Sequence, residues 1–298
     1  MRKIFLLLLL IPVFALAENG YDLWLRYPPV SARLMPAYRQ QVKEIFISGS
    51  SPTLTIIKDE LKRGIGGLLQ VSAPFVARVK TNGTLVIALN NTPLITSLGL
   101  SDNPTGPAEE GFTIATETVN GKQCIVITGS TERGLLYGTF HFLRLMQTGQ
   151  SLSALNIVSI PKLKLRMLDH WDNLNRTVER GYAGFSIWNW HLLPGYIDKR
   201  YIDYARANAS IGINAVSLTN VNANADVLTA PYIEKVAALA NVFRPYGIRV
   251  FLTARFSAPI ETGGLKTADP LDKDVQLWWK TKADEIYRQV PDFGGFLV

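Results

Sequence analysis

The 298-residue sequence contains one cysteine, Cys124, and only three histidines. A single cysteine excludes an internal disulfide, so the fold must be held by its hydrophobic core, which a chain of this length can supply. We interpret Cys124 as a buried, inert thiol. The sequence predicts no metal and no cofactor, because no ligand spacing is recognisable. A metal site built from Asp169, His170, Asp172 and His191 is the weaker alternative.

The sequence also lacks a cluster of charged residues of one sign. The chain has 31 basic and 24 acidic residues, a formal net charge of +7, and the basic residues are scattered along it. Nucleic acid is therefore not an expected partner. The sequence has no phosphate-binding loop, no G-x-S-x-G elbow and no Ser-His-Asp order, so it favours neither a nucleotide-dependent enzyme nor a serine hydrolase.

A long apolar run stands at the N-terminus. Arg2 and Lys3 precede the apolar residues 4–13, and Ala15-Leu16-Ala17 forms a small-x-small cleavage site. The run is too short to span a bilayer comfortably. We predict a signal peptide over residues 1–17, export to the periplasm or the cell exterior, and no membrane contact after cleavage.

Residues 18–150 alternate strands and helices and predict a small α/β domain. The apolar runs 44–47 and 84–89 indicate buried strands, and Asn120-Gly121 predicts a hairpin between strands at 112–116 and 123–128. A helix capped by Ser130 or Thr131 and ended by Gly149 follows. Residues 151–163 are the predicted linker to the next domain.

Residues 164–298 show a regular strand–helix alternation, which predicts a parallel sheet. The predicted strands are 165–168, 214–218, 249–254 and 293–298, and the predicted helices are 198–211, 231–246 and 272–289. A closed (β/α)8 barrel needs roughly 250 residues, whereas this stretch has 135 (164 to 298, inclusive). The predicted fold class is α/β, with a small N-terminal α/β domain followed by the first half of a (β/α)8 TIM barrel. We expect the chain to be the front part of a longer protein; a complete, open four-stranded sheet is the alternative.

Some other residues are assigned to structure rather than function. Glu109 and Glu110 lie in a Pro/Gly-rich loop and are interpreted as solvated surface. His141 is interpreted as a structural residue of the first domain. Trp278 and Trp279 lie in a predicted helix, where one of the two rings must face the barrel.

Polar and aromatic residues gather at the carboxyl ends of the predicted parallel strands, where α/β barrels place their active sites. A sugar stacks its apolar face on an indole, and its hydroxyls need many short donors and acceptors. An arginine can bind a sugar carboxylate in bidentate geometry. The sequence therefore predicts a site for an acidic sugar, and its substrate-binding candidates are His170, Trp171, Asp172, Asn173, Asn220 and Arg255.

Five segments resemble the α-glucuronidases of glycoside hydrolase family 67. They are ENGYDLWLRY at 18–27, GLLYGTFHFL at 134–143, RMLDHWDN at 166–173, GYAGFSIW at 181–188 and PDFGGF at 291–296. The resemblance runs from about Glu18 to the last residue. Its most specific part is the block 165–190, since the helix at 134–143 is similar to that of other barrel glycosidases.

The resemblance implies an enzyme that removes α-1,2-linked 4-O-methyl-D-glucuronic acid from the terminal xylose of xylan-derived oligosaccharides, with inversion and without a metal. It implies that Trp171 and Val221 line the uronic acid pocket. The family's catalytic acid and base lie beyond the position of Val298, so no catalytic residue is predicted here and the chain alone is expected to be inactive. A β-hexosaminidase-like glycosidase and a secreted, non-catalytic carbohydrate-binding protein are the alternatives. A homodimer is compatible with the sequence.

Overall fold

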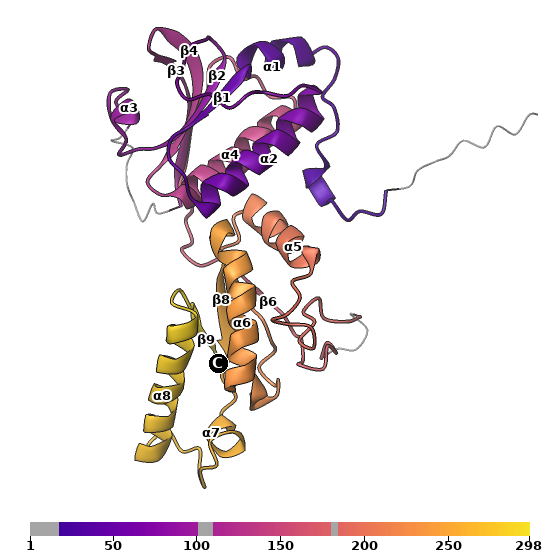
Figure 1. Ribbon diagram of the computed structural model, residues 1–298, viewed down its shortest axis with the longest axis vertical. Coiled ribbons are helices and arrows are strands. Elements are labelled where there is room, and N and C mark those ends of the chain that lie inside the picture. The colour runs from indigo at the N-terminus through magenta and orange to yellow at the C-terminus, as the bar shows by residue number, and fades with distance from the viewer. Residues whose placement is uncertain (1–17, 101–109, 180–183) are drawn as a thin grey trace, which may run out of the picture.

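The computed structural model describes residues 18–100, 110–179 and 184–298. The predicted signal peptide and Glu109 lie outside the described residues. The described chain forms two α/β parts that follow each other along the long axis of the molecule (Figure 1). The predicted α/β fold class is confirmed. No helix in these ranges is long and apolar enough to cross a membrane.

The first part is built on a five-stranded sheet with the order β1-β2-β4-β3-β5. Its strands are β1 (Glu44–Ile47), β2 (Thr84–Leu89), β3 (Phe112–Val119), β4 (Lys122–Gly129) and β5 (Asn156–Ser159). Strands β1, β2 and β4 run parallel, and β3 is antiparallel to both of its neighbours. The predicted hairpin is confirmed, because Val119 pairs with Lys122 and both turn residues, Asn120 and Gly121, have positive φ.

Two long helices pack together against this sheet (Figure 1). The helices of the first part are η1 (Leu23–Arg26), α1 (Met35–Gln41), α2 (Pro52–Leu69), α3 (Pro93–Thr96) and α4 (Glu132–Gln147). Of the two predicted caps of α4, Ser130 and Thr131, the structure shows Thr131, whose hydroxyl accepts a hydrogen bond from the backbone N of Gly134. Cys124 is buried in β4, as predicted, and the ring of His141 lies 5.4 Å from that of Phe112.

The predicted linker contains a strand of the first sheet. Within residues 151–163, β5 (Asn156–Ser159) pairs antiparallel with β3, and Ile157 lies opposite Ile114. Four residues, of which the first and last are polar, carry too short a pattern to separate an edge strand from a loop. The chain therefore leaves the first sheet only after Ser159.

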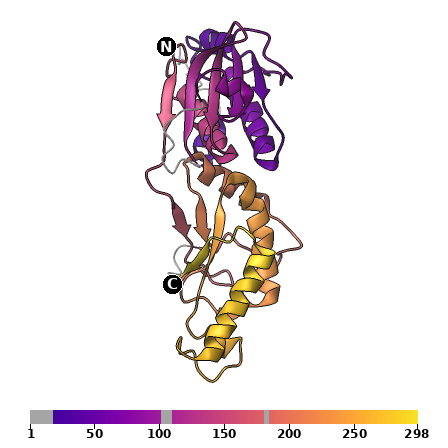
Figure 2. The same ribbon diagram turned by 90° about the vertical axis from the view of Figure 1, so that its left-hand side faces the viewer.

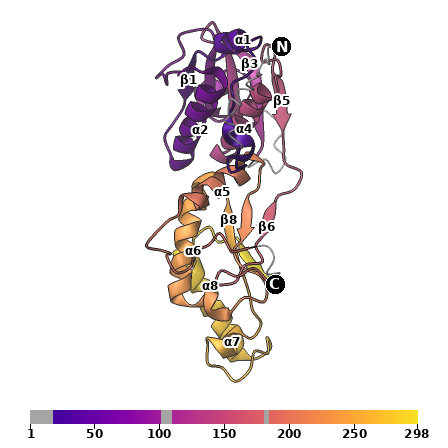
Figure 3. The same ribbon diagram turned by 90° about the vertical axis from the view of Figure 1, so that its right-hand side faces the viewer.

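The second part is a four-stranded parallel sheet with the sequential order β6-β7-β8-β9. The strands are β6 (Met167–Asp169), β7 (Ala215–Ser217), β8 (Arg249–Thr253) and β9 (Gly295–Leu297). The helices are α5 (Lys199–Ser210), η2 (Ala225–Leu228), α6 (Ala230–Phe243), η3 (Arg244–Tyr246), α7 (Ala258–Glu261) and α8 (Lys273–Gln289). In two opposite views, α5, α6 and α8 lie on one side of the strands (Figures 2 and 3). This is the order expected of the first half of a barrel, and closure into a full barrel stays a prediction.

Strand β6 differs from its prediction in place and in burial. It spans Met167–Asp169 instead of residues 165–168, so Asp169 belongs to the strand. Leu165 and Leu168 are 44% and 38% exposed, although the apolar run indicated a buried strand. The reason is that β6 forms the edge of the four-stranded sheet, where one flank has no partner strand among the described residues.

The two parts share one apolar core and a buried ion pair. A single cluster of buried side chains includes members of both sheets' helices, such as Leu143 of α4 and Ala209 of α5. At the junction, Arg206 of α5 donates from Nε to Glu60 Oε2 at 2.7 Å and from Nη2 to Glu60 Oε1 at 2.8 Å. The hydroxyl of Tyr27 donates to the same carboxylate at 2.5 Å.

Glu110 forms a second buried junction, and its assignment to solvated surface was wrong. The residue is only 7% exposed. Its carboxylate accepts hydrogen bonds from Arg133 at 2.5 Å, from Arg166, and from Nδ2 of Asn214 at 2.8 Å. Arg166 and Asn214 directly precede β6 and β7, so Glu110 connects the first part to the amino ends of two parallel strands.

Candidate functional site

The predicted site residues follow three adjacent parallel strands. His170 follows β6, Asn220 comes shortly after β7, and Arg255 comes shortly after β8. Since these strands are neighbours in the sheet, their carboxyl ends meet at one edge. The structure thus brings the three groups of predicted residues to the same rim.

Hydrogen bonds from Asn220 link the end of β7 to the end of β6. Its backbone N donates to the carbonyl of Asp172 at 3.1 Å, and its Nδ2 donates to Oδ1 of Asn173 at 2.7 Å. Asn220 is only 3% exposed, so its amide is used within the protein. Asn173 is also held by Thr177, whose Oγ1 accepts from Nδ2 at 3.0 Å. The two amides therefore stabilise the turns after β6 and β7, and that of Asn220 is shielded from a ligand.

Trp171 and Val221 are the exposed members of the predicted set. Their exposed fractions are 45% and 43%, whereas the adjacent Asp172 and Asn220 are only 5% and 3% exposed. The carbonyl of Trp171 accepts a hydrogen bond from the backbone N of Glu179 at 2.9 Å, which fixes the main chain beneath the indole. An exposed indole on a fixed main chain is the surface on which a sugar ring stacks.

His170 and Asp172 point into the protein, where they meet α5. Nε2 of His170 lies 2.8 Å from the hydroxyl of Tyr204, and Nδ1 lies 3.5 Å from Oδ2 of Asp172. Asp172 is 5% exposed, and Trp188, whose ring lies 5.0 Å from that of His170 at a tilt of 56°, is fully buried. Burial raises the pKa of the Tyr204 hydroxyl, so it stays protonated. Sequence reasoning missed Tyr204, because nothing in the pattern of a helix shows which side chain reaches a strand end.

Arg255 is already paired with a carboxylate. Its Nε lies 2.8 Å from Oε1 of Glu261, and its Nη1 donates to the carbonyl of Asn222 at 3.3 Å. A guanidinium has several N–H donors, so these contacts do not exhaust it. Sequence reasoning missed Glu261, although its position in the loop region directly after Arg255 was visible. The role of Arg255 toward a sugar carboxylate stays a prediction.

Three carboxylates lie near the described part of this rim. Asp169, at the end of β6, is exposed. Asp172 is buried beside His170, and Glu261 is bound by Arg255 and by the hydroxyl of Ser257. Across residues 18–100, 110–179 and 184–298, no three or more His, Cys, Asp or Glu side chains are grouped so that they could hold a metal ion. The exposed groups of the rim are therefore the indole of Trp171, the guanidinium of Arg255 and the carboxylate of Asp169.

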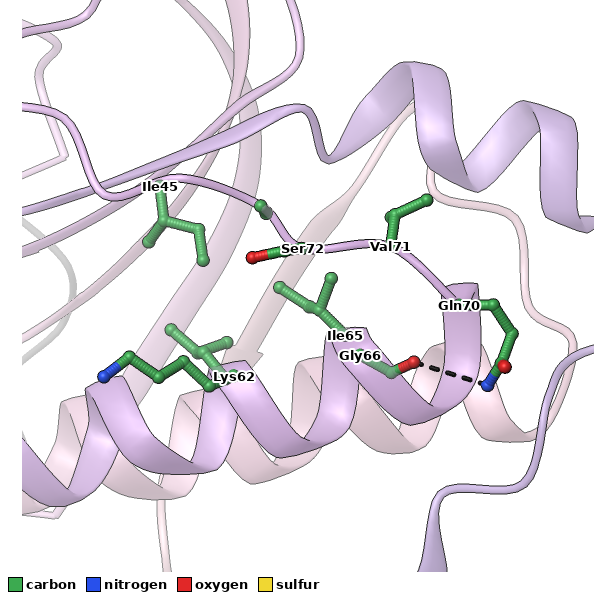
Figure 4. A pocket seen from close by; sticks show the side chains of 9 residues that line it. Ile45, Lys62, Ile65, Gly66, Gln70, Val71 and Ser72 are labelled. Carbon is green, nitrogen blue, oxygen red and sulfur yellow. Dashed lines mark hydrogen bonds between the residues drawn. The ribbon is translucent and has the colours of Figure 1, made fainter.

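A pocket in the first part is a weaker candidate for the functional site than this rim. It has a volume of about 340 Å³ and lies between α2 and the segment after it (Figure 4). Its lining is largely aliphatic, with Lys62, Gln70 and Ser72 as the polar side chains, and the amide of Gln70 is directed at the carbonyl of Gly66. The lining side chains include no carboxylate and no aromatic ring, so the pocket carries neither hydrolytic chemistry nor a stacking platform.

Two family models together cover almost all of the chain. The N-terminal domain model of glycosyl hydrolase family 67 matches residues 23–142, and the middle domain model of the same family matches residues 145–298. The chain belongs to glycoside hydrolase family 67. The boundary between the family's two domains falls in α4, so β5 lies in the middle domain by sequence while it pairs with the sheet of the first part.

Curated relatives carry the name α-glucuronidase. The chain is 36% identical to a probable alpha-glucuronidase A of Aspergillus terreus over 95% of its length, which is 33% of the relative. It is 34% identical to alpha-glucuronidase A of Emericella nidulans over 100% of its length, which is 36% of that relative. The chain thus spans about a third of the length of these family 67 relatives.

A solved structure shows a similar fold. A GH138 enzyme targeting pectin rhamnogalacturonan II superposes with a TM-score of 0.57 at 17% identity, covering 85% of this chain and 30% of that chain. At this identity the likeness concerns the fold alone. It shows that an α/β domain followed by parallel strands also occurs in a glycosidase outside family 67.

Proposed function

We propose that the protein of which this chain is part is an exported α-glucuronidase. Its substrates are xylo-oligosaccharides, from whose terminal xylose it removes α-1,2-linked D-glucuronic acid or its 4-O-methyl ether. The observation that carries the proposal is the identity of 34–36% to proteins named alpha-glucuronidase A over 95–100% of the chain. The exposed Trp171 and Val221, which stand beside the buried amide of Asn220, support it.

The rim would supply the binding wall of the sugar. In this proposal Trp171 stacks on the uronic acid ring, and Val221 contacts it near the 4-O-methyl group. Asn220 and Asn173 hold the wall in place. Arg255 pairs with the sugar carboxylate by its remaining donors, while Glu261 fixes the guanidinium.

The hydrolysis itself would use residues other than those of this rim. Inversion requires an acid at the leaving oxygen and a base roughly 6.5–9.5 Å away that activates water. Asp172 is buried and Glu261 is paired, so neither is placed for these roles. We assign the acid and the base to the part of the relatives' length that this chain does not span.

Export is proposed from the sequence alone. Arg2 and Lys3 followed by residues 4–13 and a small-x-small site at 15–17 form a signal peptide pattern. The intact mass of the protein secreted by its host tests both export and extent. A mass well above the 33.1 kDa of this chain supports a longer enzyme. A mass slightly below 33.1 kDa favours the non-catalytic binding protein.

The activity test uses the full-length protein and xylotriose that carries 4-O-methylglucuronic acid on its terminal xylose. We expect release of the uronic acid with inverted anomeric configuration, followed by proton magnetic resonance. An N-acetylhexosaminide serves as the control substrate. Its hydrolysis without uronic acid release would favour the β-hexosaminidase-like alternative, and binding of the oligosaccharide without any cleavage would favour the binding protein.

A further inference from the structure

Tyr204 of α5 reaches the turn that carries Trp171. Its hydroxyl lies 2.8 Å from Nε2 of His170, and the two rings are 5.4 Å apart at their centroids. His170 directly precedes Trp171, and its backbone N donates to the carbonyl of Ser217 in β7 at 3.1 Å. A helix side chain therefore holds the residue next to the exposed indole.

Both ring nitrogens of His170 face a polar group of the protein. Nε2 is hydrogen-bonded to the Tyr204 hydroxyl at 2.8 Å, and Nδ1 lies 3.5 Å from Oδ2 of Asp172 without forming a hydrogen bond to it. Burial raises the pKa of the Tyr204 hydroxyl and the charge of Asp172 raises it further, against a hydrogen bond with Asn208, so the hydroxyl keeps its proton.

Two aromatic rings contact the imidazole of His170. Trp188 is fully buried and lies 5.0 Å from the imidazole and 5.2 Å from the ring of Tyr204, edge to face with the latter. The imidazole thus contacts two aromatic rings, a hydroxyl at Nε2 and a carboxylate near Nδ1. Removing one polar partner frees the ring to rotate toward water, since 18% of the His170 side chain is exposed.

We propose that Tyr204 is a positioning residue of the uronic acid subsite, which acts on Trp171 through His170. The inference rests on the proposed function. Tyr204 contacts His170, the residue directly before Trp171, so its effect on the indole passes through the turn. Loss of its hydroxyl loosens the turn and weakens sugar stacking, while the hydrolytic residues, which lie elsewhere, are unaffected.

The test is Tyr204→Phe in the full-length enzyme, assayed on 4-O-methylglucuronic acid-substituted xylotriose. We expect KM to rise about fivefold, the effect of one lost buried hydrogen bond, with kcat within about twofold of wild type. Tyr201→Phe is the matched control. Tyr201 is buried in the same helix, but its hydroxyl accepts from the backbone N of Asn189 at 2.8 Å, so its removal leaves KM unchanged.

The Trp171→Ala variant serves to distinguish an effect of Tyr204 on the indole from a general destabilisation of the site. In the Trp171→Ala enzyme, the additional change Tyr204→Phe is expected to leave KM unchanged, because the indole that it positions is gone. His170→Gln, which keeps an acceptor and a donor, retains a KM closer to wild type than His170→Leu does.

Two different outcomes would overturn the inference, and only the second would also overturn the proposed function. The first is an active wild type in which Tyr204→Phe and Tyr201→Phe have the same KM, or in which Tyr204→Phe raises KM by the same factor with and without the Trp171→Ala change. In either case Tyr204 has no positioning role. If the wild type neither cleaves the oligosaccharide nor binds glucuronic acid in calorimetry, the proposed function fails and this inference fails with it.

Discussion

Replacing Glu60 by glutamine measures how strongly the two parts of the chain are joined. Glu60 is 2% exposed and receives two hydrogen bonds from Arg206, which is itself 7% exposed. The substitution keeps the side-chain volume but leaves the guanidinium buried without a counter-charge. Breaking a buried pair from one side costs about 3–5 kcal/mol. The hydrogen bond from Tyr27 is weakened at the same time.

Calorimetric unfolding of the full-length protein gives the readout. A loss of about 3–5 kcal/mol corresponds to a fall in Tm of roughly 6–20 °C for a domain of 150–250 residues. Asp59→Asn is the matched control, because Asp59 is the adjacent residue and pairs with Lys62 at 3.6 Å on the surface. A surface pair contributes about 0–1 kcal/mol, so this variant should unfold within a few degrees of wild type.

An apolar replacement tests the cause of the effect. Combining Glu60→Leu, Arg206→Met and Tyr27→Phe removes the charges and the hydroxyl together, and such replacements of buried ion pairs are often close to neutral. We therefore expect the triple variant to unfold well above Glu60→Gln. The reasoning is refuted if Glu60→Gln and Asp59→Asn lower Tm equally.

Three further predictions concern the site, the acid stability and the packing of α4. Trp171→Ala should lower kcat/KM on the substituted xylotriose at least about tenfold, since a lost stacking surface weakens binding by on the order of 1.5 kcal/mol, while Tm stays near wild type. Burial opposes ionisation of Glu110, but hydrogen bonds from Asn214, Arg166 and Arg133 outweigh it and lower its pKa below 4.5. The stabilisation by Glu110 is therefore complete above about pH 4.5 and is lost as the pH falls through the lowered pKa, so Glu110→Gln should show a smaller drop in Tm between pH 6 and pH 3 than wild type. Gly134→Ala should lower Tm by several degrees, because the added Cβ would lie against the backbone carbonyl of Gly111, and circular dichroism melting checks this.

Local patterns in the sequence were enough to predict most of the second part. Its strands and helices alternate as expected, and β7 (Ala215–Ser217) and α5 (Lys199–Ser210) lie within the predicted ranges 214–218 and 198–211. The Asn120-Gly121 turn was predictable because a two-residue hairpin of this type requires positive φ at both positions. These features depend on neighbours in sequence.

Helix α2 shows why other features were not predictable. Its segment contains Gly64, Gly66 and Gly67, which disfavour a helix by propensity. In the structure a Cβ on Gly64 would lie 2.5 Å from the side chain of Leu143 in α4, and a Cβ on Gly67 would lie 2.4 Å from the carbonyl of Tyr27. These two glycines allow close approach of distant segments, and only the fold shows those segments.

Contacts between segments that are distant in sequence also explain why the burial of Glu110 and the role of Tyr204 were not predictable. Glu110 lies in a Pro/Gly-rich loop and looked solvated, yet its partners Arg133 and Arg166 come from other elements far along the chain. Trp171 was found because it follows a strand end. Tyr204 was not found, because its partner His170 lies 34 residues away in sequence.

The polar and aromatic residues 170–172, directly after β6, alternate in direction as the residues of an extended chain do. Alternate side chains point to opposite sides, so His170 and Asp172 turn together toward α5 while Trp171, between them, turns outward. Their burial agrees, with Asp172 at 5% and Trp171 at 45% exposed. One short segment therefore carries both the surface that meets a ligand and the polar contacts that hold that surface in place. A rigid platform for a sugar requires both at the same strand end, because a stacking ring on a mobile turn loses part of its binding free energy to the ordering of that turn.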